Sequence, residues 1–96
     1  MFEISLNEQG VVVVGGRLDA AQAETAQEFL DAIAGPCIID MSALDYISSA
    51  GLGVLLSTHK RLMGSGQGLE LVNVNSHIND IFSYSGFDKL FVIKTE

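Results

Sequence analysis

The sequence predicts a small α/β domain built on a mixed, mostly parallel β-sheet with an antiparallel hairpin at its N-terminus. Short apolar runs of strand length alternate with segments of helical periodicity along most of the chain. The first two of these runs are separated only by turn residues, which favours a hairpin. The chain has 96 residues, of which 48% are hydrophobic, so we expect one domain over residues 1–96 with a single core.

The N-terminal hairpin is predicted from periodicity. Residues 2–6 alternate apolar and polar side chains, as in a half-buried strand. Asn7–Gly10 are turn formers, and Val11–Val14 form an apolar second strand. Gly15–Gly16 then allow a bend or a β-bulge at the end of that strand.

The first helix is predicted over Ala20–Ala34, with Asp19 as its N-cap and Gly35–Pro36 as its end. Its apolar residues lie on one face, as expected for a helix packed on a sheet. That face carries Ala23, Ala26, Leu30 and Ile33.

The middle of the chain is predicted to form a strand, a connection and a second helix. Cys37–Met41 is an apolar run typical of a strand buried on both faces, and Ser42–Ile47 is expected to connect it to the helix. The helix runs from Ser49 to about Met63, and its apolar positions recur at helical spacing. These positions are Leu52, Leu55, Leu56, His59 and Met63.

The C-terminal part repeats the alternation of strand and helix. We expect a strand over Leu69–Val72, a helix over Ser76–Tyr84 capped by Asn75, and a last strand over Leu90–Ile93. The resulting order is β-β-α-β-α-β-α-β, in which helices cross over between parallel strands with right-handed connections.

Composition excludes several classes of function. Five Lys and Arg stand against twelve Asp and Glu, a net charge of −7, and no basic patch favours nucleic acid or an anionic membrane. No apolar run approaches the ~20 residues that span a bilayer, and the start lacks a secretory pattern. We therefore expect no membrane insertion and a cytoplasmic location, where the lone Cys37 is a buried structural thiol.

The segment Asp40–Leu55 is the candidate functional region. Ser48 and Ser49 lie where a helix begins, and the free N–H groups of a first helical turn suit a phosphate. Gly51 and Gly53 cost about 1 kcal/mol each relative to Ala in a helix, which invites a packing or a functional explanation. From the residues alone, a plain N-cap and close packing explain the same features.

The chemistry of enzymes finds little support in the chain. It contains no phosphate loop, dinucleotide fingerprint or serine-hydrolase elbow. His59 lies on an apolar face, which is typical of a structural histidine, and His77 has no clustered Cys or His that would form a metal site. We therefore expect no catalytic residue, no metal and no cofactor.

The stretch IIDMSALDYISSAGLGVLL resembles the signature region of STAS domains, the family of bacterial anti-sigma factor antagonists. The segments GGRLDAAQAE and NSHINDIFSYSGFDKLFVI resemble the parts of that family on either side, so the resemblance covers nearly the whole chain. It implies a small mixed sheet with helices packed mainly on one face.

The resemblance also implies a regulatory role without enzymatic activity. The family's regulatory serine lies two residues before the first glycine of G-L-G, which is Ser49 here. In signalling members, a serine kinase that is also an anti-sigma factor phosphorylates this serine, and a metal-dependent phosphatase restores it. The unphosphorylated antagonist binds the kinase, which then releases the sigma factor. The expected partner-binding positions are Asp19, Asp40, Asp45, Ser48, Ala50, Gly51 and Leu52, together with Tyr46, which we expect to be exposed in the connecting loop.

Some of these residues have alternative roles that the sequence does not distinguish. Asp19 is either the cap of the first helix or part of the partner-binding surface, and Asp40 either accepts from backbone amides of the following loop or helps to form the kinase-recognition site. Many signalling members carry an acidic residue where this chain has Ser48, a difference that would alter kinase recognition or leave Ser48 as a competing phosphate acceptor. The chain stops at Glu96, where family members often continue into a final helix, and a homodimer would cover the exposed part of the sheet.

Other functions compete with the antagonist. One is a STAS scaffold or accessory subunit of a stress-signalling or lipid-transport complex. A nucleotide-binding protein lacks a phosphate loop here, and a receiver protein lacks the acidic pair expected after its first strand.

Overall fold

The computed structural model describes residues 1–95, which contain a five-stranded sheet in the order β1-β2-β3-β4-β5. Only β1 and β2 are antiparallel, and the other neighbouring strands are parallel. The mixed sheet with an N-terminal hairpin is therefore confirmed. The strands are β1 (Phe2–Leu6), β2 (Val12–Leu18), β3 (Cys37–Ile47), β4 (Leu69–Val74) and β5 (Val92–Thr95).

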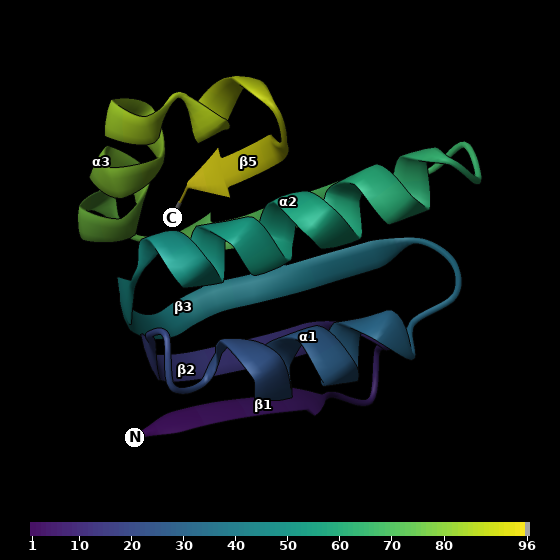
Figure 1. Ribbon diagram of the computed structural model, residues 1–96, viewed down its shortest axis with the longest axis horizontal. Helices are drawn as coiled ribbons and strands as arrows, with labels where there is room; N and C mark the ends of the chain where they lie inside the picture. Colours follow the sequence, from purple (N-terminus) through teal and green to yellow (C-terminus); the bar gives the residue numbers. More distant parts are fainter. Residues whose placement is uncertain (96) are drawn as a thin grey trace.

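Three helices join the parallel strands. They are α1 (Ala23–Asp31), α2 (Ser49–Met63) and α3 (Ser76–Ser85), and a 3₁₀ turn, η1 (Phe87–Lys89), follows α3. Because right-handed crossovers between sequential parallel strands place their helices on one side, α1 and α2 lie across the same face of the sheet (Figure 1). This confirms the arrangement that the family resemblance implied.

The hydrophobic core lies between this face and the helices. Sheet residues such as Ile39 and Leu71 are fully buried there, as is Phe82 of α3. Residues on the opposite face, such as Ile38 and Val72, remain half-exposed because no helix among the described residues covers them. Each fully buried large apolar side chain contributes roughly 1.5–3 kcal/mol, so the core holds α2 firmly against β3.

The strand β3 extends further than predicted. Residues 42–47, expected to be a connection, continue the strand and pair with β2 as far as Leu18 opposite Ile47. Pairing is irregular at two points near Gly15 and Gly16, which confirms a bulge there. The bulge lies within β2 and not at its end, because β2 continues past the predicted Val14 to Leu18. Burial of Leu44 and Ile47 stabilises this extension, and the local sequence pattern did not reveal it.

The start of α1 corrects another prediction. The helix begins at Ala23 with Gln22 in the cap position and no side-chain cap bond, so Asp19 is not its N-cap. Instead, the Asp19 carbonyl accepts a hydrogen bond from the Gln22 N–H at 3.1 Å, which forms a turn before the helix. The helix also ends at Asp31, short of the predicted Ala34.

The caps of α3 follow the prediction. The Asn75 side chain accepts a hydrogen bond from the Ile78 N–H at 2.9 Å, and Gly86 ends the helix with φ 78°. Strand β5 begins only at Val92, two residues later than predicted, because η1 occupies residues 87–89.

Side chains on and beside α2 have structural roles. His59 accepts a hydrogen bond at Nδ1 from the Leu69 N–H at 3.0 Å and meets Phe91 edge to face, which confirms a structural histidine. Met63, predicted on the apolar face, is 57% exposed. Burial raises the pKa of the Cys37 thiol, although the nearby charge of Arg61 partly opposes this, and a buried, protonated thiol is unreactive.

Candidate functional site

The first turn of α2 is attached to the ends of two parallel strands. The Ser48 N–H donates to the Leu18 carbonyl at 2.9 Å and so joins the end of β3 to the end of β2. The Ser48 hydroxyl then accepts from the Gly51 N–H at 3.2 Å, and the Ser48 carbonyl accepts from the Leu52 N–H at 2.9 Å. Ser48 is therefore the N-cap, and the helix begins at Ser49 as predicted.

The two serines differ in what their side chains do. Ser48 is half-buried and its hydroxyl oxygen is engaged in the cap. Ser49 is exposed at the first helical position, as is Ala50 beside it. The helix dipole and the uncapped N–H groups of this turn favour negative charge at Ser49.

The two glycines of the G-L-G segment also differ. A Cβ atom on Gly51 would lie 2.8 Å from Ile47 Cγ1 and 2.9 Å from both Cγ and the carbonyl oxygen of Leu18. Gly51 is buried, so close packing against β2 explains it, and it is not part of an open surface. Gly53 is exposed and no atom lies within 4 Å of a Cβ built there, so packing gives no reason for its cost in helix stability.

Asp19 lies beside this helix start. It directly follows Leu18, just as Ser49 directly follows Ser48, and a hydrogen bond joins Leu18 to Ser48. The Asp19 Oδ1 atom is buried and has no hydrogen-bond partner within residues 1–95. A buried carboxylate oxygen without a hydrogen-bond partner is costly in free energy, and packing in this structure gives no compensation for it.

Asp40 does not lie at this helix start. Because β3 continues to Ile47, Asp40 is in the middle of the strand, where it pairs with Val13 and Val72. Partial burial would raise the pKa of its carboxyl, but hydrogen bonds from Ser42 and Asn73 outweigh this and lower the pKa overall. The observed bonds are from the Ser42 N–H at 2.9 Å and from Asn73 Nδ2 at 3.0 Å.

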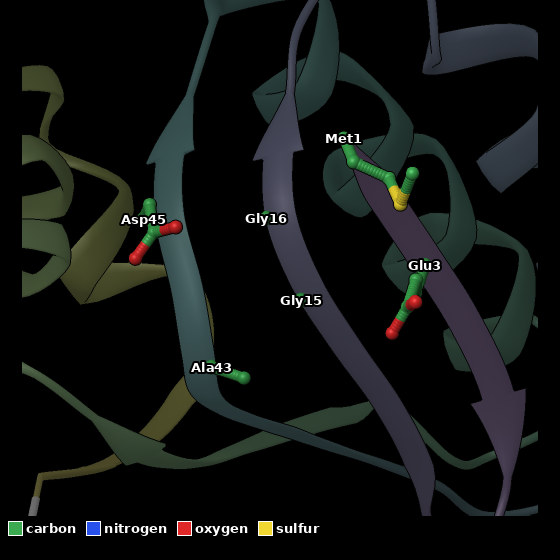
Figure 2. A pocket seen from close by; sticks show the side chains of 6 residues that line it. All are labelled: Met1, Glu3, Gly15, Gly16, Ala43 and Asp45. Carbon is green, nitrogen blue, oxygen red and sulfur yellow. The ribbon is translucent and has the colours of Figure 1, made fainter.

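Asp45 and Tyr46 are also strand residues and do not form a loop. Tyr46 is half-buried beneath the Arg17 guanidinium, which lies 4.3 Å from the centre of its ring. Asp45 is exposed and borders a hollow of about 310 Å³ on the open face of the sheet. Figure 2 shows this hollow between Asp45 of β3 and Glu3 of β1.

Glycines form the floor of the hollow. It lies over Gly15 and Gly16 of β2, and a Cβ atom on Gly16 would overlap the Met1 carbonyl oxygen. Sequence patterns did not single out Arg17 or this hollow, because both depend on pairing between β2 and the unpredicted part of β3. The structure therefore divides the predicted residues into the α2 start with Asp19 and a separate group on β3.

Neither a membrane span nor a metal centre is found among residues 1–95. None of the helices there has the length and apolar character needed to cross a bilayer. No three His, Cys, Asp or Glu side chains in the same range are grouped as a metal site would require.

Comparison with known proteins places the chain. A family model described as "Mlab, STAS domain" matches residues 3–94. The chain belongs to the STAS domain family. This confirms the resemblance of its central segment and of both flanking segments.

Several proteins similar to this STAS domain are anti-sigma factor antagonists by name. BtrV of Bordetella bronchiseptica, provisionally assigned as one, is 34% identical over 82 residues, 85% of this chain and 70% of that protein. An anti-sigma factor antagonist from Mycobacterium paratuberculosis has the same fold, with a TM-score of 0.83 at 24% identity over 100% of this chain and 86% of that one. Phosphorylated Bacillus SpoIIAA aligns with a TM-score of 0.69 at 20% identity, over 100% of this chain and 93% of that one.

Proposed function

We propose that this STAS domain is an anti-sigma factor antagonist whose binding to its partner is controlled by phosphorylation of Ser49. The observation that carries this proposal is the division between the two serines at the α2 start. Ser49 is exposed, whereas the hydroxyl of Ser48 is used as the helix cap.

The cap disfavours Ser48 as the phosphate acceptor. A kinase would have to withdraw its half-buried hydroxyl from the Gly51 N–H, at a cost of about 1 kcal/mol or more in helix stability. Ser49 requires no such rearrangement. A phosphate there gains from the helix dipole, so the fold accommodates the modified residue.

The switch would operate at the binding surface. Unmodified Ser49, together with exposed Ala50 and Gly53, offers small side chains that allow close approach of a partner. Phosphorylation adds about −1.5 to −2 charges at pH 7, at a helix start that is hydrogen-bonded to Leu18, the residue before Asp19. If burying that charge in the interface costs about 3 kcal/mol, affinity falls by roughly a hundredfold.

The proposed partners follow from the family. The binding partner is an anti-sigma factor that is also the serine kinase, and a metal-dependent phosphatase returns Ser49 to its unmodified form. Support comes from the names of the relatives and from a neighbour solved in its phosphorylated form. In this function the domain has no catalytic residues of its own and regulates transcription in the cytoplasm.

Asp19 and Tyr46 extend the proposed binding surface differently. Asp19 is half-buried next to the bond that joins Leu18 to Ser48, and it would contact the kinase from there. Asp40, Asp45 and Tyr46 belong to β3, so a partner that contacts them must reach beyond the α2 start.

Peptide mapping of the protein isolated from its host tests this assignment. We expect one phosphate on wild type and on Ser48→Ala, located at Ser49, and none on Ser49→Ala. Ser49→Asp should bind the anti-sigma factor at least about tenfold more weakly than wild type, because it places a negative charge in the interface. Phosphate on Ser49→Ala at the wild-type level would overturn the assignment.

A further inference from the structure

Strand β1 forms one edge of the sheet and has no neighbour on its outer side within the described residues (Figure 1). Its hydrogen bonds define which peptide groups are free. The Arg17 N–H donates to the Met1 carbonyl at 3.0 Å, and the Asn7 N–H donates to the Val11 carbonyl at 2.9 Å. Along a strand, the backbone N–H and C=O groups of successive residues point to alternate sides. In β1 the backbone groups of odd-numbered residues therefore point toward β2, and those of even-numbered residues point away from the sheet. The outward residues are Phe2, Ile4 and Leu6.

The same three residues carry the apolar side chains of β1. Phe2 and Ile4 are half-buried and pack at the margin of the core, whereas Leu6 is 54% exposed. Glu3 and Ser5 are exposed on the other face of the strand. The free edge therefore combines unpaired backbone groups with an incompletely covered apolar row.

The opposite edge of the sheet is protected in ways that β1 is not. Strand β5 has four residues, its pairing with β4 is irregular between Leu71 and Val74, and its Lys94 bonds to Glu70 at 3.2 Å. Short length, irregular pairing and an edge lysine are the usual defences against strand addition. Strand β1 pairs with β2 without a register shift and contains neither Lys nor Pro.

We propose that two copies of this chain associate through β1, paired antiparallel with Ile4 opposite Ile4 of the second copy. In this register each residue whose backbone groups point outward lies opposite another such residue, so each of these pairs can exchange two hydrogen bonds. Phe2 lies opposite Leu6, and Glu3 lies opposite Ser5, so apolar side chains meet and no like charges are opposed.

Alternative registers are worse for definite reasons. A shift by one residue places inward-facing peptide groups opposite outward ones and removes the ladder of hydrogen bonds. A shift by two keeps the ladder but leaves one of the three apolar residues without a partner. The register centred on Ile4 satisfies the backbone and the side chains together, which makes a second copy the occupant that fits this edge.

This dimer differs from the one expected from the sequence, because it pairs an edge strand and does not cover the open face of the sheet. The two sheets would become one continuous sheet, and Leu6 would be covered by Phe2 of the other copy. The β1 edge is separated from β3 and the α2 start by β2, so Ser49 stays accessible in each copy. The proposal does not depend on the function of Ser49.

Sedimentation equilibrium over a range of protein concentrations tests the surface. We expect wild type to reach the mass of a dimer, and Leu6→Lys to raise the dissociation constant at least about tenfold, because a charge replaces an apolar contact. Met63→Lys is the matched control, since Met63 is an apolar residue of similar exposure, 57%, on α2. A monomer at all concentrations, or equal effects of the two substitutions, would overturn the proposal.

Cysteine cross-linking tests the register. Glu3 and Ser5 form non-hydrogen-bonded pairs in the proposed dimer, with Cα atoms about 4.5 Å apart, which is within the range of disulfides. The double variant Glu3→Cys, Ser5→Cys should therefore form a covalent dimer on mild oxidation, whereas each single variant should not. Native Cys37 does not interfere because it is 1% exposed. Absence of cross-linking in a double variant that still dimerises would disprove this register.

Discussion

The starts of α2 and α3 use the same kind of cap and differ in how the cap side chain is held. Each helix follows a parallel strand, and in each a side-chain oxygen accepts a hydrogen bond from the N–H three residues later. The acceptor is Ser48 for the Gly51 N–H in α2, and Asn75 for the Ile78 N–H in α3.

The difference lies in what surrounds the cap. Asn75 also donates through Nδ2 to the Leu44 carbonyl at 3.0 Å, and Ile78 is fully buried, so the α3 start is fixed on β3 and in the core. In both helices the two residues after the cap are exposed and the third is buried, and Ser48 is tied to the sheet through its backbone N–H to Leu18. The α3 start therefore has one more side-chain hydrogen bond to the sheet than the α2 start among the bonds of the described residues.

The largest effect is expected for Gly51→Ala. The new Cβ would lie within 3 Å of Ile47 and of the Leu18 backbone, so the α2 start must shift away from β2. Such overpacking costs about 1–3 kcal/mol, which urea denaturation would measure as a lower midpoint. An unchanged midpoint would show that the α2 start is as adaptable as an exposed surface.

An element of the fold can be predicted from the sequence when neighbouring residues determine it, and is missed when contacts with distant residues determine it. Both helix starts were predicted to the residue, because the cap side chain and the apolar positions that follow are local. The second half of β3 was missed, because Ser42 and Asp45 interrupt its apolar pattern and its pairing with β2 lies about 30 residues away in sequence.

The same limit applies to the site. The sequence pattern located Ser48 and Ser49 at the helix start. It could not show that Gly51 is required by packing and Gly53 is not, since the space around Gly51 is limited by Leu18 from another strand. Asp19 is a reasonable cap in sequence, yet α1 begins only at Ala23. Tertiary contacts decided both questions.

The second prediction compares the caps directly. Asn75→Ala removes the cap bond and also leaves the Leu44 carbonyl without its donor, so we expect a loss of about 2 kcal/mol. Ser48→Ala removes one cap bond near a more open turn and should cost about 1 kcal/mol. Urea midpoints of the two variants measure the gap, and a larger loss for Ser48→Ala would reverse the comparison.

The third prediction changes the body of α2 without touching its start. Thr58 is fully buried and its hydroxyl has no hydrogen-bond partner within residues 1–95. Thr58→Val removes this unsatisfied group at nearly constant volume, so stability should rise by about 1 kcal/mol. Phosphorylation of Ser49 should be unaffected, which peptide mapping would show. A fall in stability would mean that the hydroxyl has a partner in solution.

The fourth prediction concerns Gly53, which has an open environment. Gly53→Ala should raise stability by about 0.5–1 kcal/mol through helix propensity alone, opposite in sign to Gly51→Ala. If Gly53 allows close approach of the anti-sigma factor, the same variant should bind that partner more weakly in a titration. Binding at wild-type strength would leave Gly53 outside the interface.

The smallest expected effect is a pH dependence of stability that arises close to the α3 start. Asn73, two residues before the Asn75 cap, has φ 55° and donates to Asp40. Although partial burial opposes ionisation, the bonds from Ser42 and Asn73 lower the folded-state pKa of Asp40 below its unfolded value of about 3.9. The ionised carboxylate therefore stabilises the fold above that unfolded value, and this contribution is lost as pH falls through the lower folded-state pKa.

Urea midpoints of wild type and Asp40→Asn, measured from about pH 7 to about pH 3, should converge as Asp40 becomes protonated. A constant gap between the two proteins would show that the Asp40 charge does not contribute to holding the end of β4.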